Sequence, residues 1–192
     1  MACLVLDAMG VIYQSADDVA ELLVPFLGEH SGTTTEAQIQ AAYHAASLGE
    51  ISADDFWYQV GVAPGLEDAY LERHRLNPGL MKLLVQAQGA GIPVCCLSND
   101  VGRWSQKLRT NLGVEPYLEH SVISSDVGLR KPDPRIYQIF IDTSGYRAEE
   151  LLFVDDRAKN VDAARALGIE CHLFEAQPGF TAVRDWISNQ AD

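Results

Sequence analysis

The chain has 192 residues, 47% of them hydrophobic, and a formal net charge of −13 at pH 7. This length and composition suit one globular unit that buries a sizeable core without disulfides. The negative charge repels nucleic acid and anionic membrane surfaces at long range, so we expect neither as a partner. A phosphate-bearing substrate would be repelled in the same way, so an anion site in this chain has to be local and has to include a cation.

The amino terminus opens with a short apolar run, Cys3–Leu6, which we expect to form the first strand. No basic segment precedes this run and no later stretch is long enough to cross a bilayer, so the sequence predicts neither a signal peptide nor a membrane span. We therefore expect a cytoplasmic protein. The cysteines lack the paired spacing of a zinc site or a disulfide framework, and we interpret all four as buried free thiols: Cys3, Cys95, Cys96 and Cys171.

The next run with the character of a strand begins only at Ile92, and the gap is too long for one crossover helix. Within the gap, apolar residues recur at three- and four-residue spacing and are broken by glycine and proline. We expect a small all-helical cap at residues 13–77, inserted after the first strand and lying over the sheet. Its expected helices are Ala16–Leu27, Glu36–Ser47, Ala53–Val60 and Leu66–Leu76.

The core resumes near Pro78, which suits the first turn of an expected helix over Gly79–Gly89. Apolar strands that alternate with helices predict an α/β fold. We expect a Rossmann-like three-layer core, with a parallel sheet covered on both faces, formed by residues 1–12 and 78–192. Its remaining strands are expected at Ile92–Leu97, Ser121–Ile123, Leu151–Val154 and Glu170–Phe174.

Polar residues follow three of the expected strands, and ligands of an open parallel sheet bind at the carboxyl ends of its strands. Each of these residues alone has a simpler interpretation as a helix cap, a turn residue or a surface charge. Their convergence on one edge indicates a functional site. The residues are Asp7 after the first strand, Ser98, Asn99 and Asp100 after the second, Lys131 before Pro132, and Asp155 with Asp156 after the fourth.

Three of these residues are acids: Asp7, Asp155 and Asp156. Three carboxylates held close together repel one another, which costs several kcal/mol unless protons or a cation neutralise them. The same repulsion raises the pKa of the carboxyl groups, by on the order of a few units per group. Carboxylate and backbone oxygens suit a hard ion, and Mg²⁺ retains waters and bridges to phosphate. The sequence therefore predicts a magnesium site.

In order and spacing, these residues resemble the four motifs of the haloacid dehalogenase superfamily, which also places a helical cap between its first two motifs. The motifs are Asp7, Leu-Ser-Asn at 97–99, Lys-Pro at 131–132 and Phe-Val-Asp-Asp at 153–156. The stretches at 125–137 and 154–168 are similar to the branch that contains glucose-1-phosphate phosphatase-like proteins and the amino-terminal phosphatase domain of epoxide hydrolases.

The resemblance implies that Asp7 is the nucleophile, since a carboxylate can attack phosphorus and divide the hydrolysis into two displacements. Ser98 and the Asn99 amide would donate hydrogen bonds to the transferring group, and Lys131 would supply positive charge. The same resemblance implies a metal shell of Asp7, the Met9 backbone carbonyl and Asp156, with Asp155 acting through a water and Asn160 in support.

The chain departs from the family pattern at Met9, where phosphatases of this superfamily usually carry a second aspartate that protonates the leaving alcohol. A thioether cannot transfer a proton, and general acid–base catalysis contributes about 10² to 10⁴-fold in rate. We therefore expect slow turnover, a restriction to good leaving groups, or another proton donor. Candidate donors in the cap are His44, His74, Asp54 and Asp55.

These residues favour a Mg²⁺-dependent hydrolase of small phosphate monoesters that forms an aspartyl-phosphate. The cap holds eleven acidic and two basic residues, so it disfavours a substrate with several phosphates and favours a small monophosphate such as a sugar phosphate. The sequence leaves the oligomeric state open, a homodimer included.

Two alternatives stay open at this point. A 2-haloacid dehalogenase also lacks the second acid, but such enzymes lack the metal site and typically carry Ser-Ser-Asn where this chain has Asp155-Asp156-Arg157. A catalytically degenerate relative that binds a phosphorylated ligand or a protein is the other alternative, and Met9 is the residue that supports it.

Overall fold

A computed structural model describes residues 2–30 and 34–190 of the chain and contains a five-stranded, all-parallel sheet in the order β3-β2-β1-β4-β5. Val5 in the central strand pairs with Cys95 on one side and with Phe153 on the other. The predicted parallel α/β fold is confirmed. The strands are β1 (Cys3–Leu6), β2 (Val94–Ser98), β3 (Leu118–Ile123), β4 (Leu151–Asp155) and β5 (Glu170–Leu173).

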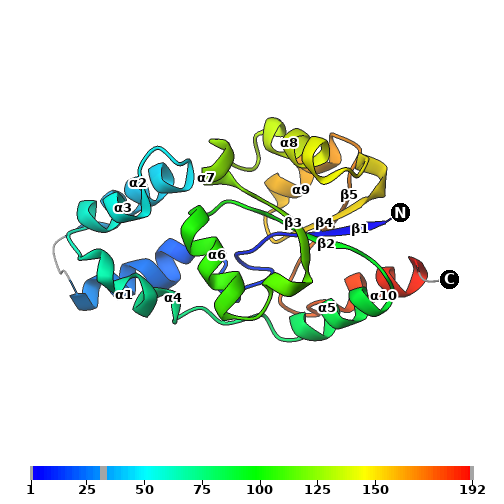
Figure 1. Cartoon of the computed structure of the whole chain (residues 1–192), viewed down its shortest axis with the longest axis horizontal. Coiled ribbons are helices and arrows are strands. Elements are labelled where there is room, and N and C mark those ends of the chain that lie inside the picture. The colour runs from blue at the N-terminus through cyan, green and yellow to red at the C-terminus, as the bar shows by residue number, and fades with distance from the viewer. Residues whose placement is uncertain (1, 31–33, 191–192) are drawn as a thin grey trace.

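Helices cover both faces of the sheet, which completes the three layers (Figure 1). Side chains of a strand alternate between faces, so Leu4 and Leu6 pack with one group of helices while Cys3 and Val5 pack with the other. The first group is α5 (Leu80–Gly89), α6 (Gly102–Asn111) and α10 (Thr181–Gln190). The second is α8 (Pro134–Ser144) and α9 (Ala158–Arg165), while the short α7 (Ser124–Val127) follows β3.

The start of α5 differs from the prediction. Its N-cap is Gly79, which has a φ of +87°, so the helix begins at Leu80 and Pro78 lies outside the first turn. A left-handed backbone is accessible to glycine at little cost, and this explains why the helix begins one residue later than expected.

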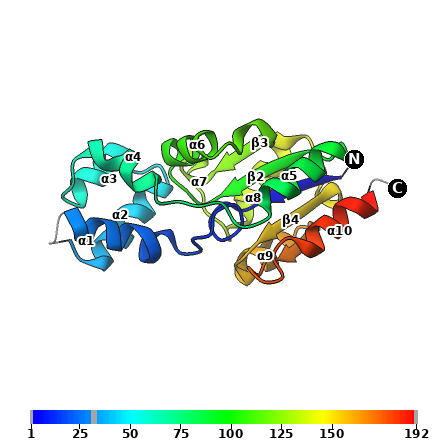
Figure 2. The ribbon, with the colours of Figure 1, turned by 90° about the horizontal axis from the view of Figure 1, so that it is seen from below.

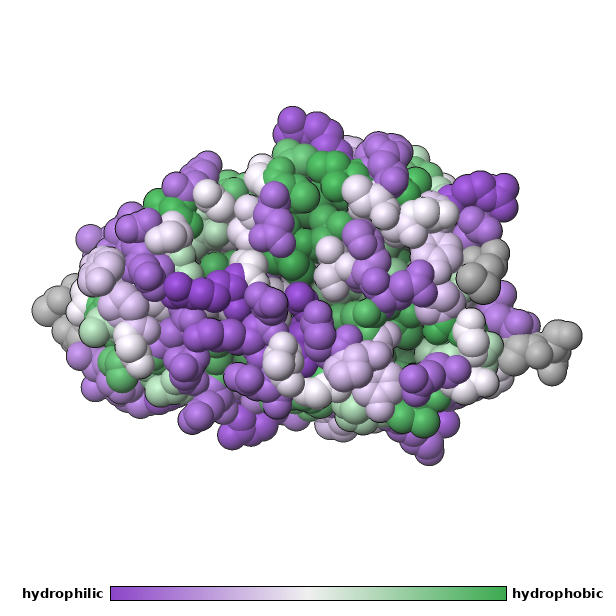
Figure 3. All heavy atoms as spheres, viewed as in Figure 1, coloured by the Kyte–Doolittle hydropathy of each residue, from purple (hydrophilic) through white to green (hydrophobic). Residues whose placement is uncertain are grey.

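The elements between β1 and α5 are all helical and lie together at one end of the sheet, opposite the two termini (Figures 1 and 2). We call this segment the helical insertion. On the face drawn in Figure 3, hydrophilic residues cover most of it. It consists of a π-helix η1 (Val19–Leu23), α1 (Val24–His30), α2 (Glu36–Ser47), α3 (Ala53–Gln59), a 3-10 helix η2 (Pro64–Leu66) and α4 (Glu67–Leu71).

Two helices of the insertion, α2 and α3, start at capping boxes. Thr35 and Gln38 form a capping box at the start of α2, and Ser52 and Asp55 form one at the start of α3. The first expected helix begins at residue 19 rather than 16, and the last ends at residue 71 rather than 76. The exact division of the chain into a core and a cap at residues 12/13 and 77/78 stays a prediction.

The two connections between core and insertion are hydrogen-bonded to each other. The Asn77 side chain donates from Nδ2 to the carbonyls of Gly10, Val11 and Tyr13 at 2.9, 2.8 and 3.0 Å. Tyr13 also forms an antiparallel bridge with Leu76. Residues 75–77 are therefore extended, which is why the last helix of the insertion ends early.

A second contact joins the insertion to α6, and it is centred on the buried carboxylate of Glu67. Its Oε2 accepts the indole N–H of Trp57 at 3.1 Å and that of Trp104 at 2.7 Å. Arg103 Nη2 lies 2.5 Å from Oε2, and Lys107 Nζ lies 2.9 Å from Oε1. Burial opposes ionisation here, yet the hydrogen bonds from Arg103 and Lys107 lower the pKa of Glu67. We call these five residues the Glu67 cluster.

The four cysteines carry free thiols, and three of them are buried as expected; Cys171 is half-buried, because β5 is an edge strand. Cys3 and Cys95 lie on neighbouring strands with their sulfurs 3.5 Å apart. None of the helices in the described ranges has the length and apolar character needed to cross a membrane.

Candidate active site

The predicted site residues meet at the carboxyl edge of β2, β1 and β4, which are neighbours in the sheet. Asp7 directly follows β1, Ser98 ends β2 and Asp155 ends β4. A cavity of about 460 Å³ opens between this edge and the helical insertion. Its walls include the loop after β1, the start of the insertion, α2, the loop that carries Lys131 and the loop after β4.

Asp7 has one carboxylate oxygen held by the protein and one without a partner among the described residues. Its Oδ1 accepts the Ala8 N–H at 2.7 Å and lies 2.7 Å from Lys131 Nζ. Burial raises the pKa of Asp7 to about 7, and the neighbouring Lys131 opposes this shift. The side chain is 8% exposed and lines the cavity, so Oδ2 is the atom of Asp7 available for chemistry.

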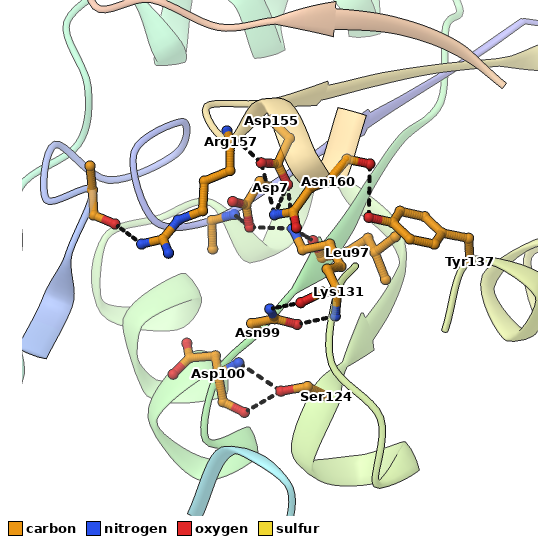
Figure 4. Close-up of polar contacts among 12 residues, drawn as sticks. Asp7, Leu97, Asn99, Asp100, Ser124, Lys131, Tyr137, Asp155, Arg157 and Asn160 are labelled. Carbon is orange, nitrogen blue, oxygen red and sulfur yellow. Dashed lines mark hydrogen bonds and ion pairs between the residues drawn. The ribbon is translucent and has the colours of Figure 1, made fainter. Parts of the chain in front are cut away.

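Lys131 is fully enclosed and binds three oxygens (Figure 4). Its Nζ lies 2.7 Å from Asp7 Oδ1, 2.8 Å from Asp155 Oδ2 and 2.7 Å from the Leu97 carbonyl. Burial opposes protonation, yet Asp7 and Asp155 raise the pKa of Lys131, so the ammonium stays charged. This lysine is a fixed positive charge between two strand ends.

Asp155 is completely buried and has its hydrogen bonds satisfied from within the protein. Its oxygens accept Lys131 Nζ, the Arg157 N–H at 2.8 Å and the Asn160 side-chain amide at 3.0 Å to each oxygen. Asn160 is in turn fixed by the hydroxyl of Tyr137, which donates to its carbonyl at 2.9 Å. Asp155 therefore orders the edge of the sheet around Lys131.

The three predicted metal-binding carboxylates are close together, each with an oxygen within 4.8 Å of the others. Within the described chain, Lys131 is the basic side chain that pairs with two members of this trio, Asp7 and Asp155. Asp156 Oδ1 is buried without a partner there, and burial together with Asp155 raises the pKa of Asp156. An unpaired buried oxygen beside a second carboxylate is an unfavourable arrangement that a bound cation removes.

The backbone at Gly10 is shaped around the same acid. A Cβ at this position would lie 2.4 Å from Asp156 Oδ2, and the φ of +80° also favours glycine. Met9, which precedes it, is buried and lines the cavity, so its backbone lies beside the trio. An all-oxygen donor set of this kind fits Mg²⁺.

A family model of haloacid dehalogenase-like hydrolases matches residues 1–168. The chain belongs to this family. Among its curated relatives, the phosphoglycolate phosphatase of Yersinia pestis is 30% identical over 97 residues, which are 50% of this chain and 42% of that one. Bifunctional epoxide hydrolase 2 of Sus scrofa is 26% identical over 106 residues, covering 53% of this chain and 19% of that one. The chain thus spans less than half the length of either relative.

A solved structure of this haloacid dehalogenase-like fold superposes over almost the whole chain. It is an enzyme of the family from Bacteroides thetaiotaomicron, an Asp→Ala mutant in complex with magnesium and inorganic phosphate. The TM-score is 0.81 at 20% identity, and the match covers 95% of this chain and 98% of that one. The structural likeness supports the fold.

Two predicted substrate-binding residues of this haloacid dehalogenase-like site have surroundings that the sequence did not indicate. Asn99 uses its side chain to hold the Lys131 backbone: Nδ2 donates to the carbonyl at 2.9 Å, and Oδ1 accepts the N–H at 2.7 Å. Ser98 is fully buried, its Oγ has no partner among the described residues, and it is not part of the cavity wall. The role of Ser98 as a donor to substrate stays a prediction.

Two arginines line the cavity that were not singled out from the sequence. Arg130 lies with its guanidinium 5.8 Å from the centre of the Tyr43 ring and bonds to the Ser47 hydroxyl. Arg157 donates to the Ala16 carbonyl at 2.8 Å. Neither pairs with an acid in the part of the chain that the structure describes. Their only sequence signal is that each adjoins a motif of the family, Lys131 for one and Asp156 for the other.

The structure separates the four candidate proton donors of the insertion. His44 lines the cavity. His74 is buried, with Nε2 2.8 Å from Asp18 Oδ1. Asp54 pairs with an arginine of α6 at 2.6 Å, and Asp55 closes the capping box of α3. One of the four therefore reaches the site.

Proposed function

We propose that this chain is a Mg²⁺-dependent hydrolase of small phosphate monoesters that acts through an aspartyl-phosphate on Asp7. The observation that carries the proposal is the state of Asp7, with Oδ1 fixed by Lys131 and Oδ2 free on the cavity wall. A carboxylate oxygen held in this way is oriented for attack on phosphorus.

The residues divide the reaction between them. Asp7 Oδ2 attacks the phosphoryl group as the bond to the leaving oxygen breaks, and water later cleaves the acyl phosphate and restores the carboxylate. Lys131 stabilises the negative charge that builds up beside Asp7. A Mg²⁺ ion bound by Asp7, Asp156 and the Met9 carbonyl would offset the repulsion between carboxylate and phosphate. Asn99 and Asp155 keep Lys131 in place.

The cavity supports a small substrate. Its volume of about 460 Å³ is at the lower part of the range for small-molecule sites, roughly 300 to 1,000 Å³. The helical insertion, which we propose to be the cap, has eleven acids and two bases, so a substrate with one phosphate meets less repulsion than one with several. Phosphorylated small metabolites, such as phosphorylated hydroxy acids or sugar phosphates, fit these conditions.

The same metal site argues against the dehalogenase alternative. Displacement of halide by Asp7 needs no cation, so it gives no reason for the unpaired Asp156 oxygen beside Asp7. The phosphatase proposal gives a reason for this oxygen, because phosphate and carboxylate are both anionic and a cation held there would offset their repulsion. Release of chloride from 2-chloropropionate that is independent of Mg²⁺ would support the dehalogenase instead.

The test is hydrolysis of p-nitrophenyl phosphate with and without Mg²⁺. We expect turnover that requires the ion, and a loss on the order of 10⁴-fold or more in Asp7→Asn, because the nucleophile is removed. The exposed Asp185→Asn on α10 is the matched control and should leave the rate unchanged. Beryllium fluoride with Mg²⁺ should stabilise the wild-type protein against heat and not Asp7→Asn. A protein that binds beryllium fluoride but releases no product would be the non-catalytic relative.

A further inference from the structure

We propose that His44, on α2 of the helical insertion, is the acid–base residue that protonates the leaving oxygen. Met9 stands where family phosphatases usually carry this acid, and its thioether has no proton to give. This inference rests on the proposed phosphatase function. It addresses the step that Asp7 and Lys131 leave open, since neither of them carries a proton to the leaving oxygen.

One face of α2 forms a wall of the cavity. Gln40, Tyr43 and His44 all line it, and their spacing of three and four residues places them on the same side of a helix. The Tyr43 hydroxyl lies 3.4 Å from the carbonyl of Asn99, the residue that holds Lys131. The face of α2 that carries His44 is thus in contact with the catalytic edge.

The last turn of α2 is anchored to the core, so this contact is a fixed part of the structure. The Ser124 hydroxyl donates to the Ser47 carbonyl at 2.5 Å. Just beyond the helix, Gly49 approaches the backbone so closely that a Cβ would lie 2.3 Å from the Ser125 carbonyl oxygen. Figure 1 shows α2 beside α7, on the side of the insertion that faces the sheet.

Three carboxylates and one phenol on the cavity wall have partners elsewhere. Asp133 is bonded to Arg135, which lowers the pKa of this carboxyl to about 2 and keeps it ionised. Asp18 accepts hydrogen bonds from both His74 and Tyr70. Burial raises the pKa of Tyr43 well above its usual value, so this phenol does not give up its proton near neutral pH. Asp17 accepts the Ala20 N–H at 3.1 Å.

His44 differs from these groups because its ring has no hydrogen-bond, ion-pair or ring partner within residues 2–30 and 34–190. It is also exposed to solvent, so a water molecule can reach the ring. Histidine is the side chain whose ordinary pKa allows it both to donate and to accept a proton near neutral pH. A histidine without a partner on the wall of a substrate cavity fits the role of proton donor.

The proposed steps balance in protons and bonds. As Asp7 Oδ2 bonds to phosphorus, the bond from phosphorus to the alkoxy oxygen breaks, and the His44 ring transfers its proton to that oxygen. The neutral ring then takes a proton from water as the water oxygen bonds to phosphorus and the bond to Asp7 breaks. The products are the alcohol and inorganic phosphate, and His44 is again protonated.

The test compares leaving groups. p-Nitrophenolate leaves without a proton, whereas the alkoxide of a small alkyl phosphate needs one, so kcat/KM is measured for p-nitrophenyl phosphate and for a panel that includes glycerol 3-phosphate. We expect His44→Gln to lose about 10²-fold or more on the alkyl substrates and less than about threefold on the aryl one. His30→Gln, at an exposed histidine of α1 away from the cavity, is the matched control.

A second variant makes the test independent of damage to folding. Met9→Asp installs the acid usual in family phosphatases, and in its presence His44→Gln should cost less than about threefold on the alkyl substrates. Equal losses on alkyl and aryl substrates, no loss on either, or a wild type that hydrolyses only aryl phosphates would each overturn the role of His44. Failure of the phosphatase proposal is distinct, because the wild-type protein would then release no phosphate from either class.

Discussion

Two buried charge clusters in this molecule are built in opposite ways. At the carboxyl edge of the sheet, which carries the proposed catalytic residues, Lys131 pairs with two of three acids that are within 4.8 Å of one another. In the Glu67 cluster, one acid receives two bases and two indole N–H groups. The first arrangement raises the pKa of Asp7 to about 7, with burial as the main cause. The second lowers the pKa of Glu67 in spite of burial.

The difference distinguishes a site that can bind a cation from a contact that only stabilises the structure. The Glu67 cluster is satisfied from within the chain, so it fixes the insertion against α6 and needs nothing from outside. The catalytic edge retains an excess of negative charge and an unpaired Asp156 oxygen among the described residues, so a divalent cation lowers its energy. Counting partners for each buried acid therefore distinguishes the two without reference to any motif.

Removing Lys131 should have the largest effect on stability, since it leaves Asp7 and Asp155 buried without their base. We expect Lys131→Met to lower the free energy of unfolding by about 3 to 5 kcal/mol, measured by urea denaturation without metal. The exposed Lys82→Met is the control and should change it by less than about 0.5 kcal/mol. If the two variants proved equally stable, the buried pairs around Lys131 would not contribute as described.

Removing the acid of the Glu67 cluster should cost somewhat less. Glu67→Ala leaves the Trp57 and Trp104 indole N–H groups buried without an acceptor, and each such loss costs about 1 to 3 kcal/mol. Glu67→Gln keeps an acceptor for the indoles, so it should cost only about 1 kcal/mol for the half-exposed ion pairs. Mg²⁺ should stabilise both variants as much as the wild type. Loss of that response would show that the two clusters are not independent.

Metal addition should produce a smaller shift than the loss of Lys131, and the most selective of these effects. At 100 times the dissociation constant, Mg²⁺ should raise the free energy of unfolding by about 2.7 kcal/mol, provided that only the folded state binds it. Asp156→Asn should remove most of this gain because it takes away a charged ligand, and Asp185→Asn should retain it. A full response in Asp156→Asn would mean that the ion binds elsewhere.

The sequence predicted the strands and the edge where the site lies, because apolar β-branched runs end at Asp7, Ser98 and Asp155. Helix limits in the insertion were less accurate where side chains and the second connection compete with the helix. Glu21 Oε1 accepts the N–H groups of Ala16 and Asp17, so these residues precede the helix rather than begin it. Such contacts depend on how the chain folds back and leave no periodic trace.

Within the site, spacing indicated which residues meet but not what each side chain binds. Asn99 lines the cavity and also holds the Lys131 backbone with both ends of its amide, while its contact with the substrate stays a prediction. The cavity position of His44, unlike that of His74, follows from the face that α2 turns towards the core. Arg130 and Arg157 were overlooked since a charged residue beside a motif looks like any surface charge.

The three hydrogen bonds from Asn77 to the Gly10, Val11 and Tyr13 carbonyls make the insertion a loop closed at its base. Entry and exit leave the core as an adjacent pair, so a foreign module with similarly spaced ends can be spliced in without altering the distance that the core must bridge. The suitable junctions are residues 14 and 76. Both lie on the insertion side of the Asn77 hydrogen bonds and outside the loop that carries Met9 and Gly10. Chimaeras joined there would exchange substrate preference together with the proposed proton donor His44, while the attacking Asp7 and Lys131 of the core are inherited unchanged.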